Sequence, residues 1–284
     1  MNGKMPVGRA DLHNHTTASD GLLTSTQLIG YAAQKGLEAV AITDHDTTNG
    51  IEEGLEAGRK YHVAVIPGIE LNTQIDRKEI HILGYFINFH SSDLQGHLVK
   101  IREAREIRAK KMVKKLVERY GFDITYDEVL LQAKSGGVGR PHIARVLMAK
   151  GIVRDVAEAF EKYLGTDCPA YVERFPISPR EGIELIEKAG GVPVLAHPGL
   201  LPDPDLVDPL LKMGIKGIEA FHSKHTQQES LRYSDLALQN GLLVTGGSDC
   251  HGELYGGMPI IGDVTVGMDV VQALKSLSAY PEYE

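Results

Sequence analysis

Histidines and carboxylates recur along this chain in short segments that are far apart in the sequence. The first segment is ADLHNHTTASDG at residues 10–21, where His13 and His15 are two residues apart. In a strand, side chains at positions i and i+2 point to the same face, so both imidazoles can bind one cation. A ligand set of histidine and carboxylate without thiolate suits Mn, Fe or Zn rather than a structural zinc knuckle.

Comparable polar residues occur at the ends of most of the other predicted strands. They are Asp44, His45 and Asp46, then Glu70, His81, His197 and His222, and finally Asp249 and His251. In α/β barrels and open α/β sheets the functional rim lies at the carboxyl ends of the strands, so we expect these side chains to converge. Any one such histidine is usually a hydrogen-bonding core or surface residue, but the joint pattern favours a metal site.

The elements that would position these residues alternate between short apolar runs and helical patterns. Strands are predicted at 7–15, 37–46, 63–72, 79–88, 192–199, 216–223 and 241–252, with helices at 24–36, 48–61, 178–191, 203–213, 226–240 and 267–277. Capping boxes mark two helix starts, Thr24 with Gln27 and Ser178 with Glu181. This βαβα order predicts an α/β fold with a mostly parallel sheet or a barrel.

Residues 91–176 interrupt this alternation and read as an all-helical insertion. We therefore expect one main domain formed by residues 1–90 and 177–284, with the insertion between two of its strands. The first helix of the insertion contains nine Lys and Arg against three Glu over residues 99–121. Such a charge run is usually a solvated face, and contact of residues 100–119 with RNA is the less favoured interpretation.

The bulk composition excludes several classes of protein. The chain has 284 residues, a net charge of -8 and two cysteines, Cys168 and Cys250, without a CxxC motif. A disulfide framework and a thiolate zinc site are therefore not expected. The N-terminal residues lack an apolar signal-peptide region, and no run is long enough to span a bilayer. We expect a cytoplasmic protein that does not bind membranes; its oligomeric state leaves no trace in the sequence.

Six ordered motifs of this chain resemble those of the PHP (polymerase and histidinol phosphatase) superfamily. They are DLHNHTTASDG, ITDHDT, PGIELN, HILGY, LAHPG and GGSDCHG. The resemblance implies a distorted seven-stranded (β/α) barrel and a cluster of three divalent metal ions, with Mn expected and Fe or Zn as alternatives. It also implies three ligand sets: His13, His15, Glu70 and Asp249; Glu70, His81 and His197; and Asp20, His45 and His251.

The resemblance also implies a reaction, the hydrolysis of a phosphate ester by metal-activated hydroxide. Catalytic roles are expected for His222, Asp249 and His251. Asp44 and Asp46 flank His45 and are candidates to support it, with helix capping preferred for Asp46.

The insertion narrows the expected substrate. GGVGRPHIARVLMAKG at 136–151 resembles the branch that removes the 3′-phosphate of nucleoside 3′,5′-bisphosphates, whose relatives trim short RNA from the 5′ end. Arg140, His222, Lys224 and His225 are the expected substrate-binding residues. Two alternatives stay open: a phosphatase of histidinol phosphate or another small monoester, and a non-catalytic metal-binding PHP module.

Overall fold

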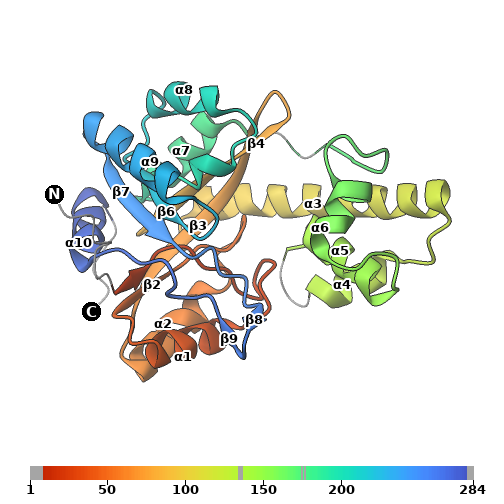
Figure 1. Cartoon of the computed structure of the whole chain (residues 1–284), viewed down its shortest axis with the longest axis horizontal. Coiled ribbons are helices and arrows are strands. Elements are labelled where there is room, and N and C mark those ends of the chain that lie inside the picture. The colour runs from red at the N-terminus through yellow and green to blue at the C-terminus, as the bar shows by residue number, and fades with distance from the viewer. Residues whose placement is uncertain (1–8, 134–136, 174, 176, 280–284) are drawn as a thin grey trace.

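A computed structural model of the chain describes residues 9–133, 137–173, 175 and 177–279. Seven strands form one sheet: β1 (Ala10–Asp11), β2 (Ala39–Ile42), β3 (Ala64–Ile75), β4 (Lys78–Tyr85), β5 (Val192–Leu195), β6 (Gly217–His222) and β7 (Leu243–Gly247). The helices of this part are α1 (Ser25–Gln34), α2 (Ile51–Tyr61), α7 (Pro179–Lys188), α8 (Val207–Leu211), α9 (Gln227–Gln239) and α10 (Met268–Leu277). They surround the sheet (Figure 1).

The strands follow one another around the sheet in sequence order, and β4 is the one strand of the seven that runs antiparallel to its neighbours. Only Asp76 and Arg77 connect β3 to β4, and both have positive φ, 47° and 67°. A connection this short allows a hairpin but not a parallel crossover. The amino end of β4 therefore lies at the rim where the parallel strands end, and His81 pairs with Asn72 there.

The sheet nearly closes into a barrel because β1 meets β7. The Leu12 amide donates to the Gly246 carbonyl at 3.3 Å, and Asn14 and Cys250 form a parallel bridge. A Cβ atom at Gly247 would lie 2.4 Å from the His13 backbone nitrogen, so only glycine allows this approach. The expected seven-stranded α/β barrel is confirmed.

Local sequence signals explain where several helices begin. The capping boxes predicted at Thr24 and Ser178 are both formed, with Gln27 and Glu181 as the reciprocal partners. Helix α7 then buries Ile186 against Gly84 of β4, where a Cβ atom would overlap the isoleucine side chain. Such contacts place the helices against the outer face of the sheet.

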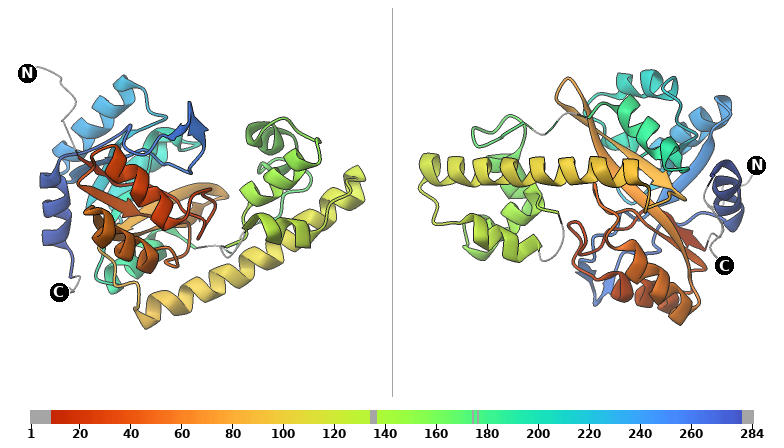
Figure 2. Two further views of the ribbon diagram at one scale, coloured as in Figure 1. Left: turned by 90° about the horizontal axis from the view of Figure 1, so that it is seen from below. Right: turned by 180° about the vertical axis from the view of Figure 1, so that it is seen from behind.

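The insertion contains α3 (Ser92–Tyr120), α4 (Tyr126–Ala133), α5 (Arg140–Ala149), α6 (Val156–Ala159) and a π-helical turn at Phe160–Leu164. Figures 1 and 2 show α3 running from the barrel along the whole length of this helical unit. Leu94, Leu98 and Ile101 of α3 pack in the barrel core. Met112 and Leu116, farther along α3, belong to a separate core of the insertion. Helix α3 is thus shared by both hydrophobic cores.

The basic residues of α3 are not all free on its surface. Arg108 is buried and donates to the Val172 carbonyl at 2.7 Å, and Lys115 donates to the Tyr171 carbonyl at 2.6 Å. Part of the charge run therefore holds the last segment of the insertion against α3. Cys168 and Cys250 are both free thiols. Among the described helices, none combines the length and the apolar character that crossing a membrane requires.

Candidate metal centre

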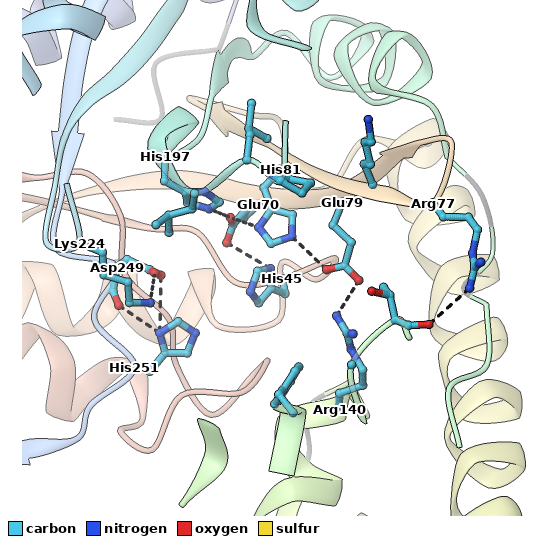
Figure 3. A pocket seen from close by; sticks show the side chains of 17 residues that line it. His45, Glu70, Arg77, Glu79, His81, Arg140, His197, Lys224, Asp249 and His251 are labelled. Carbon is cyan, nitrogen blue, oxygen red and sulfur yellow. Dashed lines mark hydrogen bonds and ion pairs between the residues drawn. The ribbon is translucent and has the colours of Figure 1, made fainter. Parts of the chain in front are cut away.

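The predicted metal ligands converge at the carboxyl ends of the strands, and Glu70 lies at their centre (Figure 3). Glu70 is 1% exposed at the middle of β3. Its Oε2 is 3.1 Å from His13 Nε2, 3.2 Å from His15 Nε2 and 3.1 Å from His45 Nδ1, while its Oε1 is 2.7 Å from His81 Nδ1 and 3.0 Å from His197 Nε2. One carboxylate thus contacts five imidazoles that come from four segments of the chain.

Two further carboxylates extend the cluster on the side of β7. Asp249, which follows β7 with a positive φ of 51°, lies 3.1 Å from His15 Nε2 and 3.3 Å from His222 Nε2. Asp20 lies 3.4 Å from His251 Nε2. His251 Nδ1 is also 3.6 Å from Asp249, so the two carboxylates share this histidine.

Within the described residues, these side chains form four groups whose ligand atoms are close enough to hold a metal ion. The groups are His15, Asp20, His45 and His251; His13, His222 and Asp249; His13, His15 and Glu70; and His45, Glu70 and His81. Glu70 is shared, as expected from its predicted bridging position. The grouping differs from the predicted sets. His15 also faces Asp20, and His222 rather than His15 and Glu70 stands with His13 and Asp249. His45 stands with Glu70 and His81, and the predicted ligand His197 is in none of the four groups.

The electrostatics of the cluster favour bound positive charge. Burial opposes ionisation of Glu70 and Asp249, yet the surrounding imidazoles hold the pKa of both carboxyls well below the usual range. Burial likewise disfavours charged His13, but Glu219, Glu70 and Asp249 raise its pKa well above the ordinary value. The carboxylates are therefore ionised at neutral pH and are balanced by positive charge next to them, which protonated imidazoles or bound cations can supply.

The hydrogen-bonding pattern leads to the same conclusion. Among the described residues, the buried Nδ1 atoms of His15 and His197 and the buried Nε2 atom of His81 have no hydrogen-bond partner. An unpaired buried polar atom is costly in an ordinary protein interior. Imidazole nitrogens with carboxylate oxygens suit Mn, Fe or Zn, so these residues fit a group of divalent ions.

Glu219 is a functional residue that the sequence analysis missed. It is fully buried in β6, accepts a hydrogen bond from His13 Nδ1 at 2.9 Å and accepts another from the His197 amide at 2.8 Å. The first bond places the proton on Nδ1 and leaves Nε2 of His13 to face Glu70. Metal-binding histidines are commonly oriented by a carboxylate in this way. A glutamate in the middle of the apolar run GIEAFH was the available signal.

Asp44 and Asp46, the two aspartates beside His45, accept hydrogen bonds that hold segments near the metal centre in place. Asp44 accepts hydrogen bonds from the Thr16 amide and hydroxyl, each 2.7 Å, which holds the loop that carries Asp20. Asp46 accepts hydrogen bonds from the amide and side chain of Asn72. The predicted helix cap at Asp46 is wrong, because Gly50 is the N-cap of α2 and Asp46 is turned toward β3.

A cavity of about 690 Å³ opens over the cluster, between the barrel and the insertion. It is lined by His45, Glu70, His81, His197, Asp249 and His251, and on its other sides by Arg77, Lys78, Glu79, Arg140, Phe160 and Lys224, among others. Figure 3 shows Arg140 reaching from the insertion toward Glu79 of β4. Their side chains form an ion pair of 2.6 Å, and the Arg140 guanidinium lies over the Phe160 ring.

The other expected substrate residues differ in their positions. Lys224 lines the cavity with a largely exposed side chain, 3.5 Å from Asp249. His222 is buried beside Asp249, and its Nδ1 accepts from the Lys224 amide. His225 does not line the cavity. Its Nδ1 donates to the Ala220 carbonyl and its Nε2 accepts from the Gly199 amide, so both ring nitrogens are engaged and the expected phosphate contact is not supported.

Comparison with known proteins places this geometry in a family. A family model described as PHP domain matches residues 11–166. The chain is 33% identical, over 89% of its length and 97% of the relative, to a phosphoribosyl 1,2-cyclic phosphate 1,2-diphosphodiesterase of Eggerthella lenta. It is 32% identical to a 3′,5′-nucleoside bisphosphate phosphatase of Chromobacterium violaceum, over 89% of this chain and 91% of the relative. A 5′-3′ exoribonuclease of Salmonella typhimurium is 34% identical over 85% of this chain and 84% of the relative.

A solved structure agrees over nearly the whole chain. A protein described as a metal-dependent phosphoesterase from Bifidobacterium adolescentis has a TM-score of 0.88 at 31% identity, covering 97% of this chain and 98% of its own. The predicted class, a phosphoesterase that depends on metal, is thereby confirmed. The chain belongs to the PHP domain family.

Proposed function

We propose that this chain removes a phosphate from a phosphorylated nucleotide, with the 3′-phosphate of a nucleoside 3′,5′-bisphosphate as the favoured substrate group. The observation that carries this proposal is the shared position of Glu70 and its five imidazoles at the base of a cavity that also contains Arg140 and Lys224. The volume of the cavity is in the range of sites that enclose a small ligand.

The proposed ligands are the nine predicted residues: His13, His15, Asp20, His45, Glu70, His81, His197, Asp249 and His251. We propose three ions, with Mn as the preferred metal. Divalent ions at such a site supply a water nucleophile at neutral pH and polarise the phosphoryl group. Asp20, Glu70 and Asp249 contribute three negative charges, so three divalent ions leave the site net positive and suited to a phosphate.

The residues of the chain provide the remaining steps. Lys224 lies within reach of the centre and offers a positive charge to the reacting phosphate. Arg140, on the opposite wall, has the planar donor geometry that binds a second phosphate in a bidentate manner. Its ion pair with Glu79 keeps the guanidinium oriented into the cavity before substrate binds. The phosphate next to the metal centre would be the one that is removed. The phosphate bound by Arg140, farther from the centre, would stay on the nucleotide. His222, the predicted residue to protonate the leaving oxygen, is buried beside Asp249 in a group that could hold a metal ion, so it would donate this proton only while its Nε2 does not bind a metal.

The names of the relatives support two further substrates for the same centre. One relative is named for a phosphoribosyl cyclic phosphate, and several are named as 5′-3′ exoribonucleases. All of these carry a second anionic group near the bond that is cleaved. The insertion, which we propose acts as the substrate-binding unit, supplies Arg140 to meet that group in each case. A histidinol phosphatase is a weaker alternative, because its substrate has one phosphate and no partner for Arg140.

The test compares substrates with and without a second phosphate. Protein loaded with Mn²⁺ is assayed for phosphate release from pAp, 3′-AMP and histidinol phosphate. Cleavage of a short 5′-phosphorylated RNA and of phosphoribosyl 1,2-cyclic phosphate is followed by chromatography of the products. We expect the highest kcat/KM with pAp and the lowest with histidinol phosphate.

A variant then tests the assignment of Arg140. We expect Arg140→Gln to raise KM for pAp about tenfold or more while KM for 3′-AMP changes little, since loss of a charged hydrogen bond costs about 1.5–3 kcal/mol. Arg119→Gln, an exposed change on α3, is the matched control. Equal rates on every substrate, or an unchanged KM for pAp, would reject the second-phosphate site.

A further inference from the structure

Two arginines of the insertion contact the loops that carry candidate metal ligands, and neither arginine has a role in the function proposed above. Arg105 is in the middle of α3, and Arg145 is in α5. Both side chains leave the insertion and bind loops of the barrel that carry candidate metal ligands. Neither arginine lines the substrate cavity over the centre.

Arg105 binds the segment that contains His45. Its guanidinium donates to the His45 carbonyl at 3.1 Å and forms an ion pair of 3.2 Å with Asp46. Asp46 in turn accepts hydrogen bonds from Asn72, whose side chain is 3.2 Å from His45 Nδ1. The Asp46 side chain is only 4% exposed, so Arg105 supplies the compensating charge for a buried carboxylate. The position of His45 thus depends on a residue of α3.

Arg145 binds the segment that contains Asp20. Its guanidinium donates to the Asp20 carbonyl at 2.5 Å. The amide of Gly137, in the segment before α5, donates to the Ala18 carbonyl at 3.3 Å in the same loop. The loop of Asp20 is thus held on one side by Asp44 of the barrel and on the other side by the insertion.

These two contacts end at one metal group. Asp20 and His45 both belong to the group that also contains His15 and His251, and His45 belongs in addition to the group of Glu70 and His81. We propose that Arg105 and Arg145 are positioning residues for this group, so that the helical insertion helps to form the metal site at His15, Asp20, His45 and His251. The other groups share His15 and His45 with this one, and their remaining members are His13, Glu70, His81, His222 and Asp249. Within the described part of the chain, the contacts of Arg105 and Arg145 are to His45, Asp46 and Asp20 rather than to these members.

The physical reason lies in the origin of the ligands. Glu70 and His81 are on paired strands whose ladder fixes them. Asp20 lies in the loop after β1, and His45 follows β2 and is joined to β3 only by a single parallel bridge with Glu70. A loop ligand keeps its geometry only if other contacts hold its backbone. Because it depends on the metal centre proposed above, this inference is tested by metal binding rather than by turnover.

The experiment uses the full chain stripped of metal and titrated with Mn²⁺, with free Mn²⁺ measured by electron paramagnetic resonance. The variants are Arg105→Gln and Arg145→Gln, and the control is Arg102→Gln, an exposed residue one turn earlier on α3. We expect one Mn²⁺ equivalent to weaken at least tenfold in both variants and every equivalent to stay within twofold in the control, since loss of such a supporting contact typically weakens metal binding 10–100-fold. Arg105→Lys, which keeps the charge beside Asp46, should recover part of the loss.

Two further measurements separate positioning from general stability. In Asp20→Asn, which should weaken the same equivalent, adding Arg145→Gln should cause less than a twofold further loss, because coupled residues are not additive. Hydrogen exchange of the metal-free protein should increase around residues 16–23 in Arg145→Gln and around 43–49 in Arg105→Gln. A uniform weakening of all equivalents with a lower Tm, or Mn²⁺ binding equal to wild type, would overturn the inference. Absence of Mn²⁺ binding in wild type would overturn the metal centre as well.

Discussion

Glu219 offers a sharp test of how the metal centre is held, because its carboxylate accepts hydrogen bonds from two different segments. One donor is Nδ1 of His13, and the other is the amide of His197. In Glu219→Gln the side chain keeps its shape, but one oxygen becomes an NH₂ group that cannot accept. Either His13 turns its proton toward Glu70, or the His197 amide loses its partner.

The expected magnitude follows from these contacts. A buried donor left without a partner costs about 1–3 kcal/mol, so the free energy of unfolding of the metal-free protein should fall by about that amount. If instead His13 changes tautomer, its Nε2 carries a proton where a metal ion must bind. Loss of such an orienting carboxylate typically weakens metal affinity 10–100-fold, which corresponds to about 1.4–2.7 kcal/mol.

The assay combines urea unfolding of the metal-free protein with Mn²⁺ titration and phosphate release at saturating Mn²⁺. Glu184→Gln is the matched control, since Glu184 is an exposed residue of α7 and undergoes the same change of charge. We expect Glu219→Gln to bind Mn²⁺ more weakly than wild type and Glu184→Gln to bind Mn²⁺ as wild type does. Mn²⁺ affinity and stability equal to wild type in Glu219→Gln would refute the role of the His13–Glu219 contact.

Three other outcomes are expected. Gly247→Ala should destabilise the protein by about 1–3 kcal/mol in urea unfolding and weaken Mn²⁺ binding, because the new Cβ would overlap the His13 backbone; unchanged values would show that β7 can shift freely. Burial lowers the pKa of His142 from 6.5 to about 4, so the unfolded chain takes up a proton in this range and the folded chain does not. The free energy of unfolding should fall by about 3 kcal/mol from pH 7 to pH 4 through this group, and His142→Asn should lack that part of the slope in urea unfolding at several pH values. Removal of metal with EDTA should abolish phosphate release and lower Tm, because ions that bind only the folded state stabilise it; an unchanged Tm in calorimetry would contradict binding at the buried centre.

Much of the centre was predictable because its ligands follow simple rules of strand geometry. His13 and His15 are two residues apart and face the same way, and Asp249 and His251 follow the last strand. Convergence at the rim required only that the strands be nearly parallel. The antiparallel β4 is the exception. The predicted strands left residues 73–78 between them, and the two-residue connection at Asp76 and Arg77 that requires a hairpin is seen only in the structure.

Long-range partners could not be predicted, because local patterns do not specify them. Nothing near Arg140 indicates an ion pair with Glu79, which is 61 residues away. Glu219 reads as an ordinary strand residue until His13 is placed beside it. For His225, sequence position next to Lys224 suggested a shared role, but the turn after β6 directs the ring toward backbone groups instead. Such outcomes depend on which segments the fold brings together.

The continuity of α3 has a consequence for how the substrate cavity can change its width. The helix has 29 residues and contains neither proline nor glycine between His97 and Tyr120, so it is a stiff rod about 43 Å long without an internal hinge. Its first turns are fixed in one core and its last turns in the other. A tilt of about 5° at the barrel would carry the far end by roughly 4 Å. Small repacking around Leu94 and Leu98 is thereby amplified at the opposite wall of the cavity. The size of the substrate that the cavity admits then depends on residues far from the metal centre.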